Sequence, residues 1–113
     1  YGQGIFKKII NDTMNKEEFD KLKIRLMNEG NKFFDIPMDK YDLDVVISLN
    51  NYHAGYAAVA HNPCLTIPIG LRKSNEPAGI TFIGKSFSEQ LLYEIGFYFE
   101  ESYKGRVPPK NSN

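Results

Sequence analysis

Apolar residues in the first third of the chain recur at helical spacing. The members of this stripe are Phe19, Leu22, Leu26 and Met27. Asn15 and Glu18 precede it with the spacing of a capping box, so we predict an amphipathic helix over residues 16–30. Gly30 costs a helix about 1 kcal/mol relative to alanine, and the helix is expected to end or fray there. Pro37 should stop any continuation.

A second apolar stripe near the other end of the chain predicts a helix over residues 87–104. The members of this stripe are Leu91, Leu92, Ile95, Phe99 and Tyr103. Ser86 and Glu89 again have capping-box spacing, and Gly105 is a typical helix end. Gly96 suggests a close contact between this helix and the sheet. We expect the Phe and Tyr residues of the helix to lie in the core.

Three runs rich in β-branched and aromatic residues predict strands at residues 44–49, 64–69 and 78–84. The polar loop Arg72–Glu76 joins the second run to the third, which favours an antiparallel pair. Pro68 has no N–H for a ladder, so it should lie at an edge, a strand end or a bulge. Two shorter helices are expected near residues 3–10 and 54–60.

The run over residues 44–49 is continuous rather than alternating, which is typical of a strand buried on both faces. A short helix links it to strand 64–69, an arrangement typical of parallel strands. Gly79 and Gly84 should mark tight turns or close backbone approach. The predicted fold class is therefore α/β, with a small mixed sheet packed by the helices over 16–30 and 87–104.

Composition narrows the functional classes. The chain has 113 residues, enough for one small domain, and 14 basic residues balance 14 acidic ones, so we expect no nucleic-acid partner. Its single cysteine favours a reducing compartment, and no secretory leader opens the chain, so we expect a cytoplasmic protein. The small apolar run Ala54–Ala60 is too short to span a membrane. A start at Tyr1 rather than at methionine suggests a piece of a longer protein.

Four segments carry a set of motifs in a fixed order. Asp42–Leu49 reads D-L-D-V-V-I-S-L and contains an L-D strand motif. Asn62–Gly70 reads N-P-C-L-T-I-P-I-G, and Glu76–Gly84 reads E-P-A-G-I-T-F-I-G. Phe87–Glu100 begins F-S-E and is followed by R-x-P at Arg106 and Pro108. Together they resemble the C-terminal portion of enzymes of the amidase signature family. The resemblance covers most of residues 1–113 and is closest over residues 42–109. The F-S-E form is more similar to stand-alone bacterial amidases than to amidotransferase subunits.

The resemblance implies that these residues form part of the larger amidase-signature α/β sheet. Members hydrolyse non-peptide C–N amide bonds of small molecules with a serine nucleophile, a second serine and a lysine, and need no cofactor or metal. This chain has no Gly-Gly or Ser-Ser pair of the kind that carries those serines. Lys85 lies at a strand-to-helix turn and is not the family's lysine. Asn62, Leu49 and Gly96 depart from the family pattern, which leaves the substrate open.

Other candidate sites are weaker. Cys64 with His53 or His61 could suggest a cysteine hydrolase, but a cysteine that begins an apolar strand is better explained by packing. The two histidines lack the further partners that zinc needs, so we expect no metal site. Asn50, Asn51, Tyr52 and His53 follow the end of a strand, where α/β sheets often bind ligands. The resemblance places this loop near the substrate tunnel, and a solvated turn is the alternative.

Two functional hypotheses follow. The first is the C-terminal fragment of an amidase, which is inactive by itself because the catalytic triad lies elsewhere. The second is a non-catalytic binding or interaction module that retains the amidase scaffold. In either case, exposed sheet edges should promote self-association.

Overall fold

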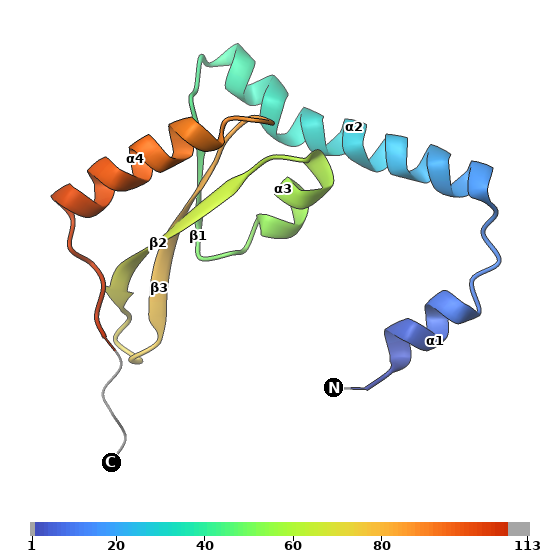
Figure 1. Ribbon diagram of the computed structural model, residues 1–113, viewed down its shortest axis with the longest axis horizontal. Coiled ribbons are helices and arrows are strands. Elements are labelled where there is room, and N and C mark those ends of the chain that lie inside the picture. Colours follow the sequence, from blue (N-terminus) through green and yellow to red (C-terminus); the bar gives the residue numbers. More distant parts are fainter. Residues whose placement is uncertain (1, 109–113) are drawn as a thin grey trace.

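The computed structural model describes residues 2–108, and these form four helices and three strands (Figure 1). In chain order they are α1 (Gly4–Ile10), α2 (Lys16–Lys40), β1 (Val46–Leu49), α3 (Ala54–Ala60), β2 (Cys64–Leu71), β3 (Pro77–Ile83) and α4 (Glu89–Ser102). All three predicted strands and all four predicted helices are present. The α/β class is therefore confirmed.

The sheet has the order β1-β3-β2, and both pairings are antiparallel. Strands β2 and β3 form the predicted hairpin, closed by a hydrogen bond of 2.8 Å from Arg72 N to Glu76 O. Strands β1 and β2 point the same way, but β3 lies between them, so no parallel pair forms in the described chain. The sheet is therefore antiparallel rather than mixed, because the hairpin leaves the second edge of β3 free for β1.

The expected irregularity at Pro68 is confirmed. The β2–β3 register shifts between Pro68 and Gly70, and β2 is an edge strand of the described sheet. Close backbone approach at Gly79 is also confirmed, since a Cβ atom there would lie 2.9 Å from Thr66 Cγ2. A side chain at Gly84 would collide with Ser88.

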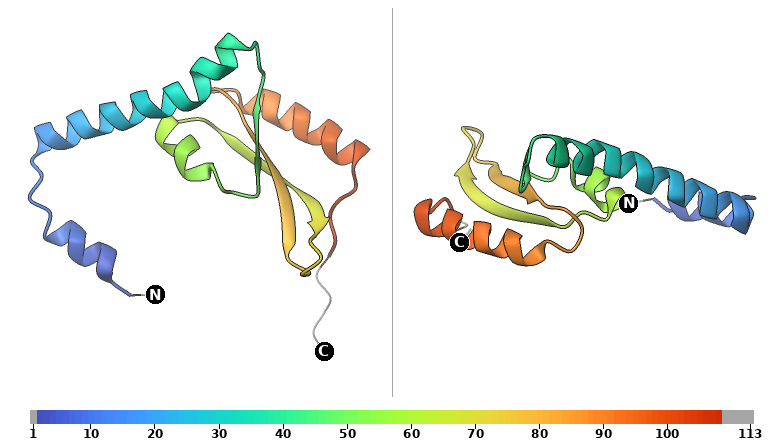
Figure 2. Two further views of the ribbon diagram at one scale, coloured as in Figure 1. Left: turned by 180° about the vertical axis from the view of Figure 1, so that it is seen from behind. Right: turned by 90° about the horizontal axis from the view of Figure 1, so that it is seen from above.

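Helices cover both faces of the sheet (Figure 2). On one face α4 packs over β2 and β3 through the buried residues Ile67, Phe82 and Leu92. On the other face, α2 and α3 bring together a second core, made of Phe34, Met38, Ala57, Ala60 and Ile83. Successive residues of β3 alternate between the two cores, as the strand geometry requires.

The prediction that the first strand is buried on both faces is wrong. Ile47 is 60% exposed and Leu49 is 48% exposed. Both pair with β3 residues that point toward α4, namely Phe82 and Ile80. Their apolar side chains are exposed because α4 lies over β2 and β3 and leaves this edge strand uncovered.

Helix α2 begins as predicted and ends later than predicted. The capping box of Asn15 and Glu18 is present, yet the helix runs through Gly30 and Pro37 to Lys40. Gly30 is needed here because it is buried against Ala60, and a Cβ atom at Gly30 would lie 2.8 Å from Ala60 Cβ. Beyond Pro37 the helix is retained because Met38 is fully buried in the core.

The start of α4 also differs from the prediction. Ser86 does not cap the helix; its hydroxyl donates to His61 O at 2.9 Å, and the helix begins at Glu89. The contact at Gly96 is confirmed, since a Cβ atom there would lie 2.5 Å from Leu65 Cδ2. Phe99 packs on Phe82 with ring centroids 5.5 Å apart.

The remaining aromatic residues of α4 are not in the core, contrary to expectation. Tyr93, Phe97 and Tyr98 are each more than three-fifths exposed. They lie on the helix face opposite Leu92 and Gly96, which pack on the sheet, so nothing in the described chain covers them.

Residues 4–29, which comprise α1 and the first half of α2, project from the body and are called the arm. No residue of the arm is buried. Figure 1 shows α1 apart from the other elements, with the chain hooking back from the start of α2. None of the helices in residues 2–108 is both long and apolar enough to cross a membrane.

Replacing Gly30 by alanine tests the contact between α2 and α3. The change raises helix propensity by about 1 kcal/mol, but its Cβ would meet the backbone of Ala60, and we expect a net loss of about 1–3 kcal/mol in unfolding free energy. Gly55→Ala in α3 is the matched control, because its Cβ meets nothing within 4 Å. Urea unfolding followed by circular dichroism measures both variants. Equal effects would contradict the contact.

Candidate functional site

The loop Asn50–His53 joins β1 to α3 and begins by closing the sheet. Asn50 N donates to Gly79 O at 2.8 Å, and Asn50 Oδ1 accepts from Gly79 N at 2.7 Å. Asn50 has a left-handed backbone with φ of 50°, which asparagine tolerates better than most residues. Both polar groups of Gly79 thus pair with one asparagine, so Asn50 fixes the loop to the sheet.

A row of hydroxyl groups crosses the sheet beside this loop. Ser48 on β1 and Thr66 on β2 both pair with Thr81 on β3. Thr66 Oγ1 and Thr81 Oγ1 lie 2.8 Å apart, and the Thr81 hydroxyl also donates to Asn50 O. The row occupies the face opposite α4, where it satisfies buried polar atoms and connects the loop to all three strands.

His53 is the last residue of the loop and directly precedes α3. Its Nδ1 lies 2.7 Å from Ser48 Oγ, and its ring stacks on Phe33 at a centroid distance of 6.2 Å and at 24° between planes. Ser48 is only 3% exposed, so its hydroxyl cannot reach a substrate from solvent. The pair therefore orients His53 and does not form a nucleophile with its base.

Three of the four predicted site residues line two separate hollows. Asn50 and Asn51 line a shallow hollow of about 350 Å³ together with Thr66, Pro68 and Gly79. Tyr52 lines a separate apolar groove of about 490 Å³ between α2 and α3; its other lining residues include Leu26, Phe33, Tyr56 and Val59. His53 lines neither hollow. The side chains of Asn51 and Tyr52 are exposed and free to meet another molecule.

Cys64 is exposed on the edge strand β2, so the prediction that it packs in the core is wrong. Neighbouring chain still covers part of the thiol, and this partial burial raises its pKa. A raised pKa lowers the thiolate fraction at neutral pH, which argues against a catalytic cysteine. His61 ends α3 in a left-handed conformation, and His53 precedes its first residue, so both histidines lie at helix ends as expected. No group of three metal-binding side chains occurs in residues 2–108.

Lys85 forms an ion pair rather than a catalytic group. Its Nζ lies 2.5 Å from Asp39 Oδ1, which joins the end of α2 to the turn before α4. The hydrogen bond to Asp39 raises the pKa of Lys85. The amine therefore stays protonated at neutral pH and cannot accept a proton from a nucleophile.

Three contributors to this region were not identified from the sequence: Phe33, Thr66 and Thr81. Phe33 follows Leu26 by seven residues and so continues the apolar stripe past Gly30. The threonines become neighbours once the hairpin register is known. That register depends on the shift at Pro68, so spacing alone could not supply it.

The arrangement of strands and helices is that of a segment of the amidase fold. An amidase family protein from Bacillus anthracis matches with a TM-score of 0.82 and 34% identity, over 97% of this chain and 22% of that protein. The peptide amidase of Stenotrophomonas maltophilia matches with a TM-score of 0.88 over 100% of this chain and 26% of that protein. At 20% identity the second match shows the fold alone.

The sequences agree with this result. A probable amidase of Arabidopsis thaliana is 30% identical over 97% of this chain, which spans 22% of that relative, or about a fifth of its length. Other relatives include mycobacterial proteins named putative amidase and A subunits of glutamyl-tRNA(Gln) amidotransferases. No model of a known protein family matches the chain. The homologues are thus those of the amidase signature family, and the resemblance seen in the sequence is confirmed.

Asn50→Ala tests whether the loop is fixed to the sheet. The change removes the acceptor for a buried Gly79 N–H and puts alanine at a positive φ, so we expect a loss of about 2–4 kcal/mol in unfolding free energy. Asn51→Ala, on an exposed neighbour, should change stability by less than about 0.5 kcal/mol. Chemical denaturation compares the two. A loss of the same size in both variants would show that the Gly79 contacts do not hold the loop.

Proposed function

We propose that these residues are the C-terminal scaffold segment of an amidase that hydrolyses non-peptide C–N amide bonds of a small molecule. The observation that carries the proposal is the match to the Bacillus anthracis amidase family protein, which extends over 97% of this chain but only 22% of that one. The nucleophile, its activating serine and its lysine would lie in the rest of the polypeptide. Such chemistry requires no metal or other cofactor.

The contribution of this chain would be to shape the substrate path. Asn51 and Tyr52 are exposed and could line it, while Asn50 and His53 hold the loop through Gly79 and Ser48. Neither hollow contains a lysine or a serine that could start acyl transfer. The single exposed cysteine is compatible with a reducing cytoplasm.

An activity-based serine probe tests whether the nucleophile lies outside this chain. We expect a fluorophosphonate to label no serine of the 113-residue chain, because Ser48, which lies beside His53 in the described residues, is buried and out of the probe's reach. The complete polypeptide that contains these residues should be labelled once and should release ammonia from primary amides. Mass spectrometry locates the label, and a coupled assay measures ammonia.

Two outcomes would contradict the proposal. Ammonia release by the 113-residue chain would place the chemistry within it. A complete polypeptide that neither reacts with the probe nor hydrolyses any amide would instead favour a non-catalytic binding module. A coding sequence that continues upstream into a glycine- and serine-rich segment supports the amidase.

We also propose that the 113-residue chain self-associates when it is separated from the rest of an amidase. The outer edges of β1 and β2 have no neighbouring strand within the described residues, and Ile47 and Leu49 lie exposed beside one of them. Open edges with apolar neighbours favour pairing between chains. Light scattering should give a mass above 12.9 kDa that rises with concentration. A constant mass of one chain would refute this.

A further inference from the structure

The chain exposes far more surface than a compact protein of its size. Its accessible area is 9341 Å², whereas the scaling for folded monomers gives about 6,300 Å². Its radius of gyration is 18.1 Å, against about 13 Å for a compact domain of this length. About 3,000 Å² of surface is therefore in excess.

Part of the exposed apolar surface lies along one line of α2. Phe19, Leu26 and Phe33 are separated by seven residues each and share one helix face, and their exposed fractions are 56%, 44% and 52%. The apolar groove continues this line onto α3, where Tyr56 stacks on Phe33 with ring centroids 5.5 Å apart. A continuous apolar surface thus runs from the arm to α3.

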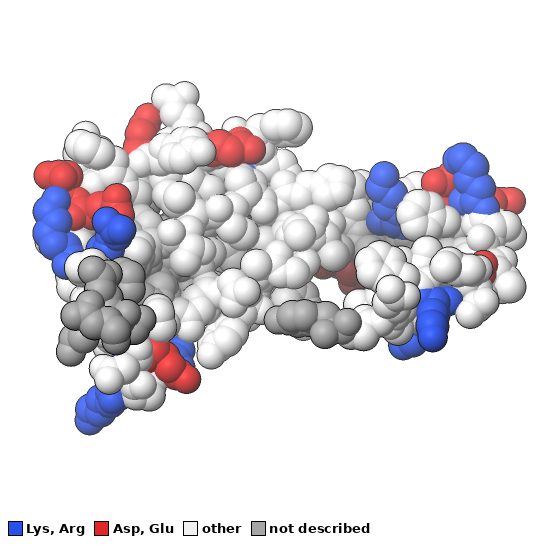
Figure 3. Space-filling view, turned by 60° about the horizontal axis from the view of Figure 1, so that its bottom comes forward, with Lys and Arg blue, Asp and Glu red and all other residues white. Residues whose placement is uncertain are grey.

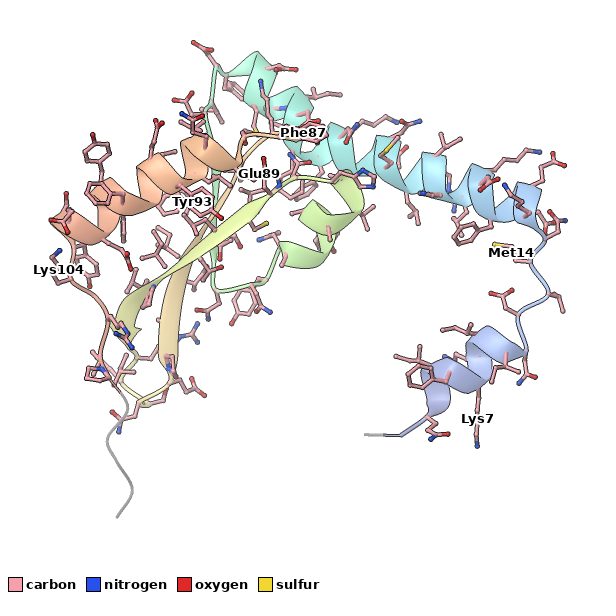
Figure 4. The ribbon with its side chains drawn as sticks, viewed as in Figure 1. Lys7, Met14, Phe87, Glu89, Tyr93 and Lys104 are labelled. Atoms are coloured by element: carbon pink, nitrogen blue, oxygen red, sulfur yellow. The ribbon has the colours of Figure 1, made fainter. Side chains whose placement is uncertain are left out.

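Helix α1 carries a further exposed apolar face. Figure 4 shows Lys7 pointing away from α2 and α3. Because successive helical residues are rotated by about 100°, Ile5 and Ile9 lie on the face opposite Lys7, toward the inside of the hook. Both are more than three-fifths exposed. A helix of 7 residues with no buried side chain has too few internal bonds to be stable by itself.

Few charged residues border this surface, and Glu29, which lines the groove, is paired with Lys32. On α2, Lys16 pairs with Asp20 and Lys21 pairs with Glu17, and all four side chains are exposed to solvent. Helix α3 has no charged residue. Figure 3 shows charged side chains gathered at the two ends of the molecule and a broad uncharged region between them. The pattern is that of a large apolar interface with a polar surround.

We propose that Ile5, Ile9, Phe19, Leu26, Phe33 and Tyr56 form a docking surface for the catalytic portion of the amidase chain. This inference rests on the proposed function and identifies the surface through which the segment would contact the rest of the amidase. The fold match to the Stenotrophomonas maltophilia peptide amidase includes the arm, since it covers 100% of this chain, and about three-quarters of that protein lies outside the match. The conformation of an arm without internal support is thus the one adopted against a larger body.

The excess area favours this occupant over a second copy of the chain. A standard interface buries about 800 Å² on each partner, and large obligate dimers bury about 1,000–2,500 Å². The excess of about 3,000 Å² exceeds both, so a body larger than this chain is needed to cover it.

Hydrogen exchange tests the docking surface in the complete polypeptide that contains these residues, alongside the 113-residue chain. In the chain alone, amides of the arm should exchange nearly as fast as in an unfolded peptide. In the complete polypeptide the same amides should exchange at least about 100-fold more slowly, because a packed body covers them. Equal exchange in both would overturn the proposal, whether or not the polypeptide is an enzyme.

Two variants locate the contact. Leu26→Asp puts a charge on the docking surface, and Asn28→Asp puts the same charge on the opposite side of the same helix. We expect Leu26→Asp to lower the melting temperature of the complete polypeptide by about 5 °C or more, and Asn28→Asp to change it by about 1 °C at most. In the 113-residue chain neither substitution should change the melting temperature, since both side chains are exposed there.

The outcomes separate the two proposals. A protected arm in a polypeptide that hydrolyses no amide would leave the docking surface standing and refute the amidase function. An active polypeptide in which Leu26→Asp and Asn28→Asp behave alike would refute the docking surface. A stable dimer of the 113-residue chain that protects the arm and is dissolved by Leu26→Asp would identify a second copy as the occupant and overturn the proposal.

Discussion

The contact between Gly30 and Ala60 determines how the two halves of the chain are joined. Because Gly30 has no side chain, α2 can approach α3 until a Cβ atom would lie within 2.8 Å of Ala60 Cβ. At this distance Phe34 and Met38 enter the core with Ile83 of the sheet. The same contact directs the first half of α2 away from the body. The position of the arm, and with it the exposed apolar surface, thus depends on one close approach between two small residues.

Polar groups around the loop Asn50–His53 and the sheet hold the shape of the molecule. Asn50 binds both polar groups of Gly79, Ser48 orients His53, and the hydroxyls of Thr66 and Thr81 connect two strands. Lys85, which might suggest a base, is tied to Asp39. The chain is similar to about a fifth of the length of a probable amidase, and these polar groups stabilise that segment of the fold. Within the loop Asn50–His53, the side chains of Asn51 and Tyr52 are exposed.

The sequence predicted the elements well because their signals are local. The capping box at Asn15, the hairpin around Arg72–Glu76 and the bulge at Pro68 each depend on a few neighbouring residues. The predictions that were wrong concern helix ends and side-chain burial, which depend on contacts with residues distant in the sequence. Gly30 and Pro37 did not end α2, because burial against Ala60 and in the core offset their local cost. Ile47 and Tyr93 are exposed because no element of the described chain packs on them. The two candidate hollows could not be separated without the positions of α2 and α3.

The central claim is that the arm is held by a body larger than this chain and not by the chain itself. Small-angle X-ray scattering of the 113-residue chain, extrapolated to zero concentration, tests this most directly. The account predicts a radius of gyration at or above 18.1 Å, since nothing in the described chain draws the arm onto the body. A value near 13 Å, that of a compact domain of this length, would show that the chain covers its own apolar surface and would contradict the account.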